Sequence, residues 1–283
     1  MKRLWTLGLL MGVSCGKSSS DPAPAPPPPA APEPGREDGF EKLGPPKAGE
    51  WLAHFKEDGQ TFEQYVSGCA NRKSLERPVF YIQPLGEAGA RYAKTLDLMR
   101  DYAEAFFNVK AKVCDPIPMF ENGYVPQRQQ YNSTMIIGQL TERAPKDALV
   151  YIGITEHDLF SRGLNFVFGE GNLRDRTGVY SLRRYATPDP VHFNRRALKL
   201  MAHEVGHILS IHHCIYYKCV MQGANSLDED DRHPMHLCPI DLRKLEWNTG
   251  FDRAERYRRL RDLYAAAGMS AEADWVAGRL PAR

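Results

Sequence analysis

The stretch HEVGHILSIHHCIYYKCVM, from His203 to Met221, gathers side chains that bind metals. It contains four histidines, one glutamate, two cysteines and one methionine, in a chain with 9 His and 6 Cys. Residues four apart lie on one face of a helix, so the imidazoles of His203 and His207 can converge on one ion. Glu204 lies one step further round, within reach of a water bound to that ion. The pattern predicts a zinc site on a helix.

A third ligand is predicted beyond the end of that helix. His213 follows His207 at the spacing of the last histidine in HExxHxxGxxH proteins. Three protein ligands leave one zinc position open for water, which is the catalytic arrangement. Ser210 stands where such chains usually have glycine, and a left-handed backbone there costs serine about 1 kcal/mol more than glycine. This departure leaves His212 as a competing third ligand.

The chain around this stretch alternates between apolar runs and helical patterns. Short β-prone runs such as ALVYIGIT predict buried strands, and apolar residues at helical spacing predict the helices between them. The expected helices are Glu50 to Cys69, Ala88 to Asn108, Gln129 to Glu142 and Phe193 to Leu209, and the expected strands are Val79 to Gln83, Val109 to Cys114, Ala148 to Thr155, NFVFGEGN and TGVYSLRRY. The alternation predicts an α/β domain with a mixed sheet, followed from Pro239 by a mainly helical part.

The first 48 residues differ in composition from the rest of the chain. Lys2 and Arg3 precede an apolar run that is too short to span a bilayer, so residues 1–15 read as an export signal. Cys15 follows directly, as in bacterial lipoprotein signals, where the cysteine is lipidated and anchors the protein to a membrane; the alternative is a plain secretory signal. Residues 16–48 are rich in Pro, Ala and Ser and predict an extended tether before a domain at 49–283.

Length and charge narrow the classes of partner. A chain of 283 residues with 42% hydrophobic residues is long enough for one sizeable core. The net charge of +2 favours no polyanionic partner, and the arginines from Arg253 to Arg261 read as the solvated face of a helix. We therefore expect no nucleic-acid binding and a monomer.

Several ordered blocks resemble one protein family. The string HExxHxx(S)xxHC-x4-C-x-M, together with FYIQPLGE, RQQYNS, YIGITEHDLF, NFVFGEGN with VYSLRRY, and CVMQGANSL, is similar to the archaemetzincins, zinc metallopeptidases of the metzincin clan. The resemblance covers about Arg77 to Leu280. It implies a metzincin-like fold, peptide or protein substrates and hydrolysis of peptide bonds.

The resemblance also implies roles for particular residues. His203, His207 and His213 would hold the catalytic zinc, Glu204 would be the general base, and Met221 would form the Met-turn beneath the zinc. A second, structural zinc would be held by Cys214, Cys219 and Cys238, with Asp241 where the family has a fourth cysteine. Asp can bind zinc through oxygen. The alternatives are His236 as fourth ligand, no second zinc, or Asp241 as a helix cap.

Three further expectations concern the substrate, the remaining cysteines and the activity. By analogy with metzincins, the sheet edge above the cleft is Asn165, Phe166, Val167, Phe168 and Gly169, where a substrate would add as an extended strand. Cys69 and Cys114 remain after the metal and lipid assignments, and in an exported protein they could form a disulfide or stay as buried thiols. The alternative function is a zinc-binding, catalytically weak peptide-binding lipoprotein.

Overall fold

The computed structural model describes residues 39–68 and 71–281, and its centre is a five-stranded sheet. The strand order is β2-β1-β5-β8-β7, in which β7 runs antiparallel to β8 and the other pairs are parallel. The strands are β1 (Val79–Pro84), β2 (Lys110–Val113), β5 (Ala148–Thr155), β7 (Gly169–Asn172) and β8 (Thr177–Ser181). A smaller sheet joins β3 (Tyr124–Val125), β4 (Gln130–Asn132) and β6 (Leu159–Phe160). The predicted mixed α/β class is confirmed.

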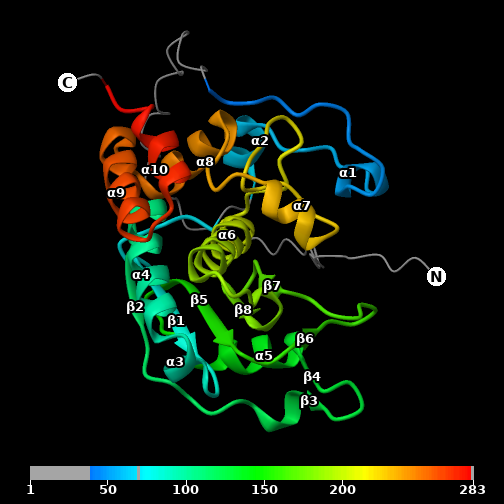
Figure 1. Ribbon diagram of the computed structural model, residues 1–283. Helices are drawn as coiled ribbons and strands as arrows, with labels where there is room; N and C mark the ends of the chain where they lie inside the picture. The colour runs from blue at the N-terminus through cyan, green and yellow to red at the C-terminus, as the bar shows by residue number, and fades with distance from the viewer. Residues whose placement is uncertain (1–38, 69–70, 282–283) are drawn as a thin grey trace.

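Helices cover both faces of the five-stranded sheet (Figure 1). They are α1 (Trp51–His54), α2 (Phe62–Ser67), α3 (Ala88–Arg91), α4 (Ala93–Phe107), α5 (Ser133–Arg143), α6 (Pro190–Ile208), α7 (Leu227–Arg232), α8 (Pro239–Thr249), α9 (Arg253–Ala266) and α10 (Ser270–Ala277), with short 3-10 turns at Glu121–Gly123 and Arg183–Tyr185. The C-terminal part is helical, as predicted. None of the helices in the described residues is long and apolar enough to cross a membrane.

Alternating side chains of the strands explain why both faces are covered. Successive residues of a strand point to opposite faces. Phe80 and Ile82 of β1 belong to a large core with α4 and α6, whereas Tyr81 belongs to a smaller core with α5. β1 and β5 are buried along their whole length, and they read as continuous apolar runs because neither of their faces is left to solvent.

Three predicted helices differ from the observed ones. Glu50 to Cys69 forms α1 and α2 separated by a loop, because Gly59 takes a positive φ of 69° and the loop side chains bind elsewhere in the chain. Ala88 to Asn108 is interrupted at Tyr92, between α3 and α4. The helix predicted from Gln129 begins at Ser133, since Asn132 ends β4 and caps α5 by accepting from the Met135 amide.

The packed part of the chain begins before residue 49. Phe40 lies edge-on to Trp275, the Leu43 amide donates to the carbonyl of Tyr216, and Lys42 forms a bridge with Tyr217. Residues assigned to the tether from the sequence therefore contact the domain from Phe40 on. The export signal and Cys15 lie outside the described residues.

Only one partner of the possible Cys69–Cys114 disulfide lies in the described residues. Cys114 is a free, half-buried thiol that follows β2 at the carboxyl edge of the parallel strands, and Cys69 lies outside the described residues.

Candidate metal centres

The helix α6 positions the first histidines of the motif. Asp189 caps it by accepting from the Val191 amide at 2.9 Å, and Pro190 occupies its first position, where the missing N–H costs nothing. Its second half is buried between the sheet and the loops that follow it. His203, Glu204 and His207 are therefore held on rigid, buried backbone.

A tight turn at Ser210 returns the chain toward α6. The Ser210 amide donates to the carbonyl of His207 at 2.8 Å and the Ile211 amide to that of Gly206 at 2.9 Å, which is the Schellman pattern of helix endings. Ser210 has φ of +70°, the left-handed conformation expected from the motif. The turn brings His213 to His203 and His207, so that one ligand atom from each lies within 4.8 Å of the others. His212 is not part of this group.

Each of the three imidazoles is oriented by a hydrogen bond at Nδ1. His203 Nδ1 lies 2.8 Å from the carbonyl oxygen of Val220, and His207 Nδ1 lies 2.7 Å from that of Ile211. His213 Nδ1 lies 2.8 Å from Glu57 Oε1. An oxygen partner fixes the proton on Nδ1 and leaves the Nε2 lone pair for a metal.

The three histidines fit a zinc ion. Zn–N distances near 2.0 Å put two tetrahedral nitrogens about 3.3 Å apart, and Nε2 of His203 and His207 lie 3.0 Å apart. Nε2 of His213 is buried without a hydrogen-bond partner among the described residues. Burial and the neighbouring His213 lower the pKa of His203 to about 3, and burial also lowers the pKa of His207. The rings of His203 and His207 are thus neutral, as metal ligands must be.

Glu204 follows His203 on α6 and is buried. Its side chain is 3% exposed, and its Oε1 has no hydrogen-bond partner among the described residues. Burial, with smaller contributions from Glu170 and Asp230, raises the pKa of Glu204 to about 8. A carboxyl group with a pKa near neutrality is suited to exchanging protons with a reacting molecule.

Met221 packs beneath the histidine helix. A Cβ atom added at Gly206 would lie 2.4 Å from Met221 Sδ, so only glycine permits this approach. The Cys214 amide donates to the Met221 carbonyl at 2.8 Å, and the preceding Val220 carbonyl orients His203. Met221 therefore contacts α6 at Gly206, between the two histidines of the helix.

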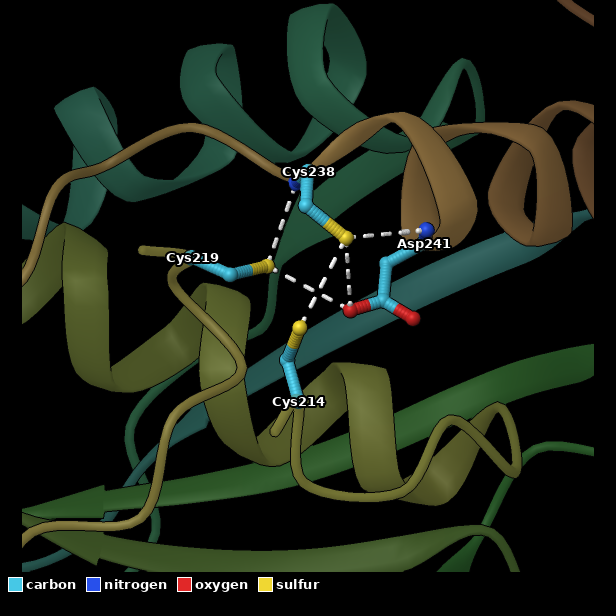
Figure 2. A group of neighbouring side chains, drawn as sticks. All are labelled: Cys214, Cys219, Cys238 and Asp241. Atoms are coloured by element: carbon cyan, nitrogen blue, oxygen red, sulfur yellow. Dashed lines mark hydrogen bonds between the residues drawn. The ribbon is translucent and has the colours of Figure 1, made fainter. Parts of the chain in front are cut away.

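A second group of side chains fits a tetrahedral zinc site (Figure 2). Cys214 Sγ and Cys238 Sγ lie 3.6 Å apart, while Asp241 Oδ2 lies 3.3 Å from Cys219 Sγ and 3.4 Å from Cys238 Sγ. Ligands at usual Zn–S and Zn–O distances would have sulfurs about 3.7 Å apart and sulfur–oxygen pairs about 3.5 Å apart. A disulfide would need about 2.05 Å. The four atoms therefore have the spacing of metal ligands.

The surroundings of Asp241 exclude two of the alternatives. Its carboxylate does not cap α8: Cys238 is the cap residue, and Asp241 Oδ1 instead pairs with the buried Lys244 ammonium at 2.8 Å. His236 stacks on Trp275 with ring centroids 3.7 Å apart and is not in the group. Burial, with the charge of Cys214, raises the pKa of Asp241 to about 6.

The edge strand begins later than predicted. Of Asn165 to Gly169, only Gly169 belongs to a strand, and the edge strand of the described sheet is β7, Gly169–Asn172. Phe168 stacks on Tyr185 with centroids 4.6 Å apart, and Val167 forms an isolated bridge with Leu159 of β6. A Cβ at Gly171 would lie 3.2 Å from Ile208, so β7 runs directly over the end of α6.

Sequence reasoning missed the residues that support both groups. Glu57, Trp51 and Gln60 contact the turn and the third histidine across 150 or more positions, whereas Lys244 pairs with Asp241 three positions away. Burial alone would raise the pKa of Glu57, but its hydrogen bond and attraction to His213 outweigh it and lower the pKa. No local pattern marks Glu57, Trp51 or Gln60. For Lys244, the spacing of one helical turn from Asp241 was an available signal.

Three histidines aimed at one point beside a buried glutamate define the class of zinc-dependent hydrolases. The comparisons with known proteins narrow this class. Residues 121–247 match the model of peptidase family M54. Archaemetzincin-2 of Mus musculus is 32% identical over 267 residues, covering 78% of this chain and 74% of its own. Archaemetzincin of Archaeoglobus fulgidus is 34% identical over 158 residues, covering 56% of this chain and 92% of its own.

Two solved archaemetzincin structures have a similar fold. The crystal structure of the Archaeoglobus fulgidus protein superposes with a TM-score of 0.52 at 32% identity, covering 59% of this chain and 99% of that one. The Methanopyrus kandleri archaemetzincin gives a TM-score of 0.56 at 26% identity, covering 62% of this chain and 97% of that one. The chain belongs to the archaemetzincin family, and it is a zinc metallopeptidase with a metzincin-like fold.

Proposed function

We propose that His203, His207 and His213 hold the catalytic zinc and that Glu204 is the general base of peptide hydrolysis. The observation that carries this proposal is the convergence of three Nε2 atoms, each with its Nδ1 bonded to oxygen, beside an unpartnered Glu204 Oε1. Zinc in such a site lowers the pKa of water to about 7 and polarises a carbonyl group. Peptide or protein substrates follow from the family.

Glu204 supplies the proton transfers. Its carboxylate takes the proton of the attacking water, and the resulting carboxylic acid gives that proton to the leaving nitrogen as the C–N bond breaks. Burial raises the pKa of Glu204 in the metal-free protein, and the positive charge of a bound zinc ion would favour the carboxylate form that accepts the proton. Its burial keeps bulk water from competing for these transfers.

The substrate lies along β7 as an added extended strand. β7 is at the end of the described five-stranded sheet, next to the last turns of α6. Backbone hydrogen bonds to such an edge hold a peptide with little regard to its side chains. We therefore propose that the substrate contacts Gly169–Asn172 instead of Asn165–Phe168.

A second zinc, held by Cys214, Cys219, Cys238 and Asp241, is part of the same proposal. The spacing of the three sulfurs and Asp241 Oδ2 supports it. In addition, we propose export and membrane anchoring through Cys15. The support for the anchor is the sequence pattern alone, and it stays a prediction.

The test compares Glu204→Ala and Glu204→Gln with the unaltered protein. General acid–base catalysis contributes about 100-fold or more, so peptide turnover should fall at least that far while zinc per chain is unchanged. Glu142→Gln, on the exposed surface of α5, is the matched control and should keep full activity. Turnover by Glu204→Ala at the unaltered rate would reject the mechanism. Zinc binding without turnover in the unaltered protein would favour the binding-module alternative.

A further inference from the structure

The segment before β1 forms part of the wall around the third histidine. Gln60 Nε2 donates to the carbonyl of Ser210 at 3.1 Å, and Gln60 Oε1 accepts from the His212 amide at 3.2 Å. Tyr65 donates to the carbonyl of Leu209 at 2.9 Å. One side chain, Gln60, therefore bridges both sides of the turn that carries the chain from α6 to His213.

Glu57 lies at the centre of this segment and binds His213 directly. Its Oε1 accepts from His213 Nδ1 and from Trp51 Nε1, each at 2.8 Å. The Trp51 ring is 4% exposed and lies edge-on to His213, with centroids 5.3 Å apart at 79°. Hydrogen bond and ring contact together fix both the tautomer and the plane of the His213 ring.

His213 differs in this respect from the other two histidines. His203 and His207 are oriented by backbone carbonyls, which no substitution at those positions removes. His213 lies on a loop after a strained residue and is oriented by a side chain 156 positions away. The orientation of the His213 ring therefore depends on one side chain, Glu57, which a substitution can remove.

We propose that Glu57 is a positioning residue of the metal centre, aided by Gln60 at the Ser210 turn. Glu57 keeps the proton of His213 on Nδ1 and thereby turns Nε2 toward the zinc. The inference rests on the proposed function, because it takes His213 as a ligand. It also goes beyond the family motif, since Glu57 and Gln60 lie outside residues 121–247 that match the family model.

The experiment measures metal affinity in Glu57→Ala and Glu57→Gln by competition with a chelator. Loss of such a partner typically costs 10- to 100-fold in metal affinity, so Glu57→Ala should bind zinc at the histidine site about that much more weakly. Glu57→Gln should fall between, because its amide oxygen still accepts a hydrogen bond but carries no charge. Replacing zinc by cobalt distinguishes the two sites in the absorption spectrum. Cobalt in the cysteine site has a sulfur-to-metal absorption band, and cobalt in the histidine site does not.

Glu63→Gln is the matched control, because Glu63 lies in the same segment with its side chain 75% exposed. It should keep the affinity of the unaltered protein, and the unfolding temperature of the metal-free Glu57 variants should match that of the control. Unchanged affinity and an unchanged cobalt spectrum in Glu57→Ala would overturn the proposal while leaving the zinc site intact. A fall in metal-free stability without weaker binding would also overturn it. Failure of the unaltered protein to bind zinc through its histidines would reject the proposed function as well.

Discussion

At the scale of single residues, Asp241 shows how one substitution in a metal site changes its surroundings. A carboxylate replaces the thiolate of the family pattern, and its second oxygen pairs with the ammonium of Lys244. Both side chains are only 2% exposed. A buried charge is tolerated when it is paired and hydrogen-bonded, so Lys244 depends on Asp241 just as the metal site does. Asp241 thus contacts both Lys244 and the cysteines, so a change at Asp241 affects all of them.

Asp241→Ala should therefore have two separable effects. Zinc should fall from two per chain to one, because one ligand is lost. The free energy of unfolding should fall by about 3–5 kcal/mol, because Lys244 keeps a buried charge without a partner. Metal analysis of reduced protein and urea unfolding measure the two effects.

The double variant Asp241→Ala with Lys244→Met separates the effects. Removing the orphaned ammonium should restore part of the stability without restoring the second zinc. One zinc per chain in the unaltered, reduced protein would contradict the two-zinc reading. Full recovery of zinc in the double variant would show that Asp241 is not a ligand.

At the scale of elements, the end of α6 decides whether the histidines meet. The Schellman ending requires a left-handed residue, and Ser210 adopts that conformation although it is not glycine. Its Oγ accepts from the Asn71 amide at 3.3 Å, and its carbonyl accepts from Gln60. Hydrogen bonds from a distant segment thus offset the backbone strain that serine introduces.

Ser210→Gly should stabilise the protein modestly. Relief of the left-handed strain contributes about 1 kcal/mol, and loss of a weak neutral hydrogen bond removes about 0.5–1 kcal/mol. We expect the free energy of unfolding in urea to rise by less than 1 kcal/mol and zinc content to stay constant. Gln129→Gly is the control, since Gln129 is exposed with φ of 53° and should show the relief alone. A loss above 1 kcal/mol in Ser210→Gly would show that the Asn71 bond outweighs the strain.

At the scale of the whole molecule, the sequence predicted the features that are set by residues close together in the chain. The helix carrying His203 and His207 and the buried run Ala148 to Thr155 follow from periodicities that sterics impose. The position of His213 follows from the spacing of the HExxHxxGxxH motif. Features that depend on chain folding over long separations were missed. Glu57 and Gln60 were hidden in a segment predicted as one helix, because their contacts with His213 and Ser210 cross 156 and 150 positions of the chain.

The metal-free molecule should be sensitive to acid because it buries neutral histidines. Burial and the charge of Lys199 lower the pKa of His233 to about 3, and burial with His213 lowers that of His203 to about 3 as well. Between pH 6.5 and about 3 the unfolded chain takes up protons that the folded protein cannot, so stability falls as pH falls. Each such histidine contributes about 1.4 kcal/mol per pH unit in that window.

Urea unfolding of the chelator-treated, reduced protein at several pH values below 6.5 measures this fall. His233→Phe keeps the ring volume but removes one titrating group, so its stability should decline with a slope lower by about 1.4 kcal/mol per pH unit. His54→Phe, at an exposed position of α1, is the control and should leave the slope unchanged. An unfolding free energy that stays constant below pH 6.5, or an equal slope in His233→Phe, would contradict the prediction. Zinc should oppose the fall until protons compete for its histidine ligands, because the metal binds only their neutral form.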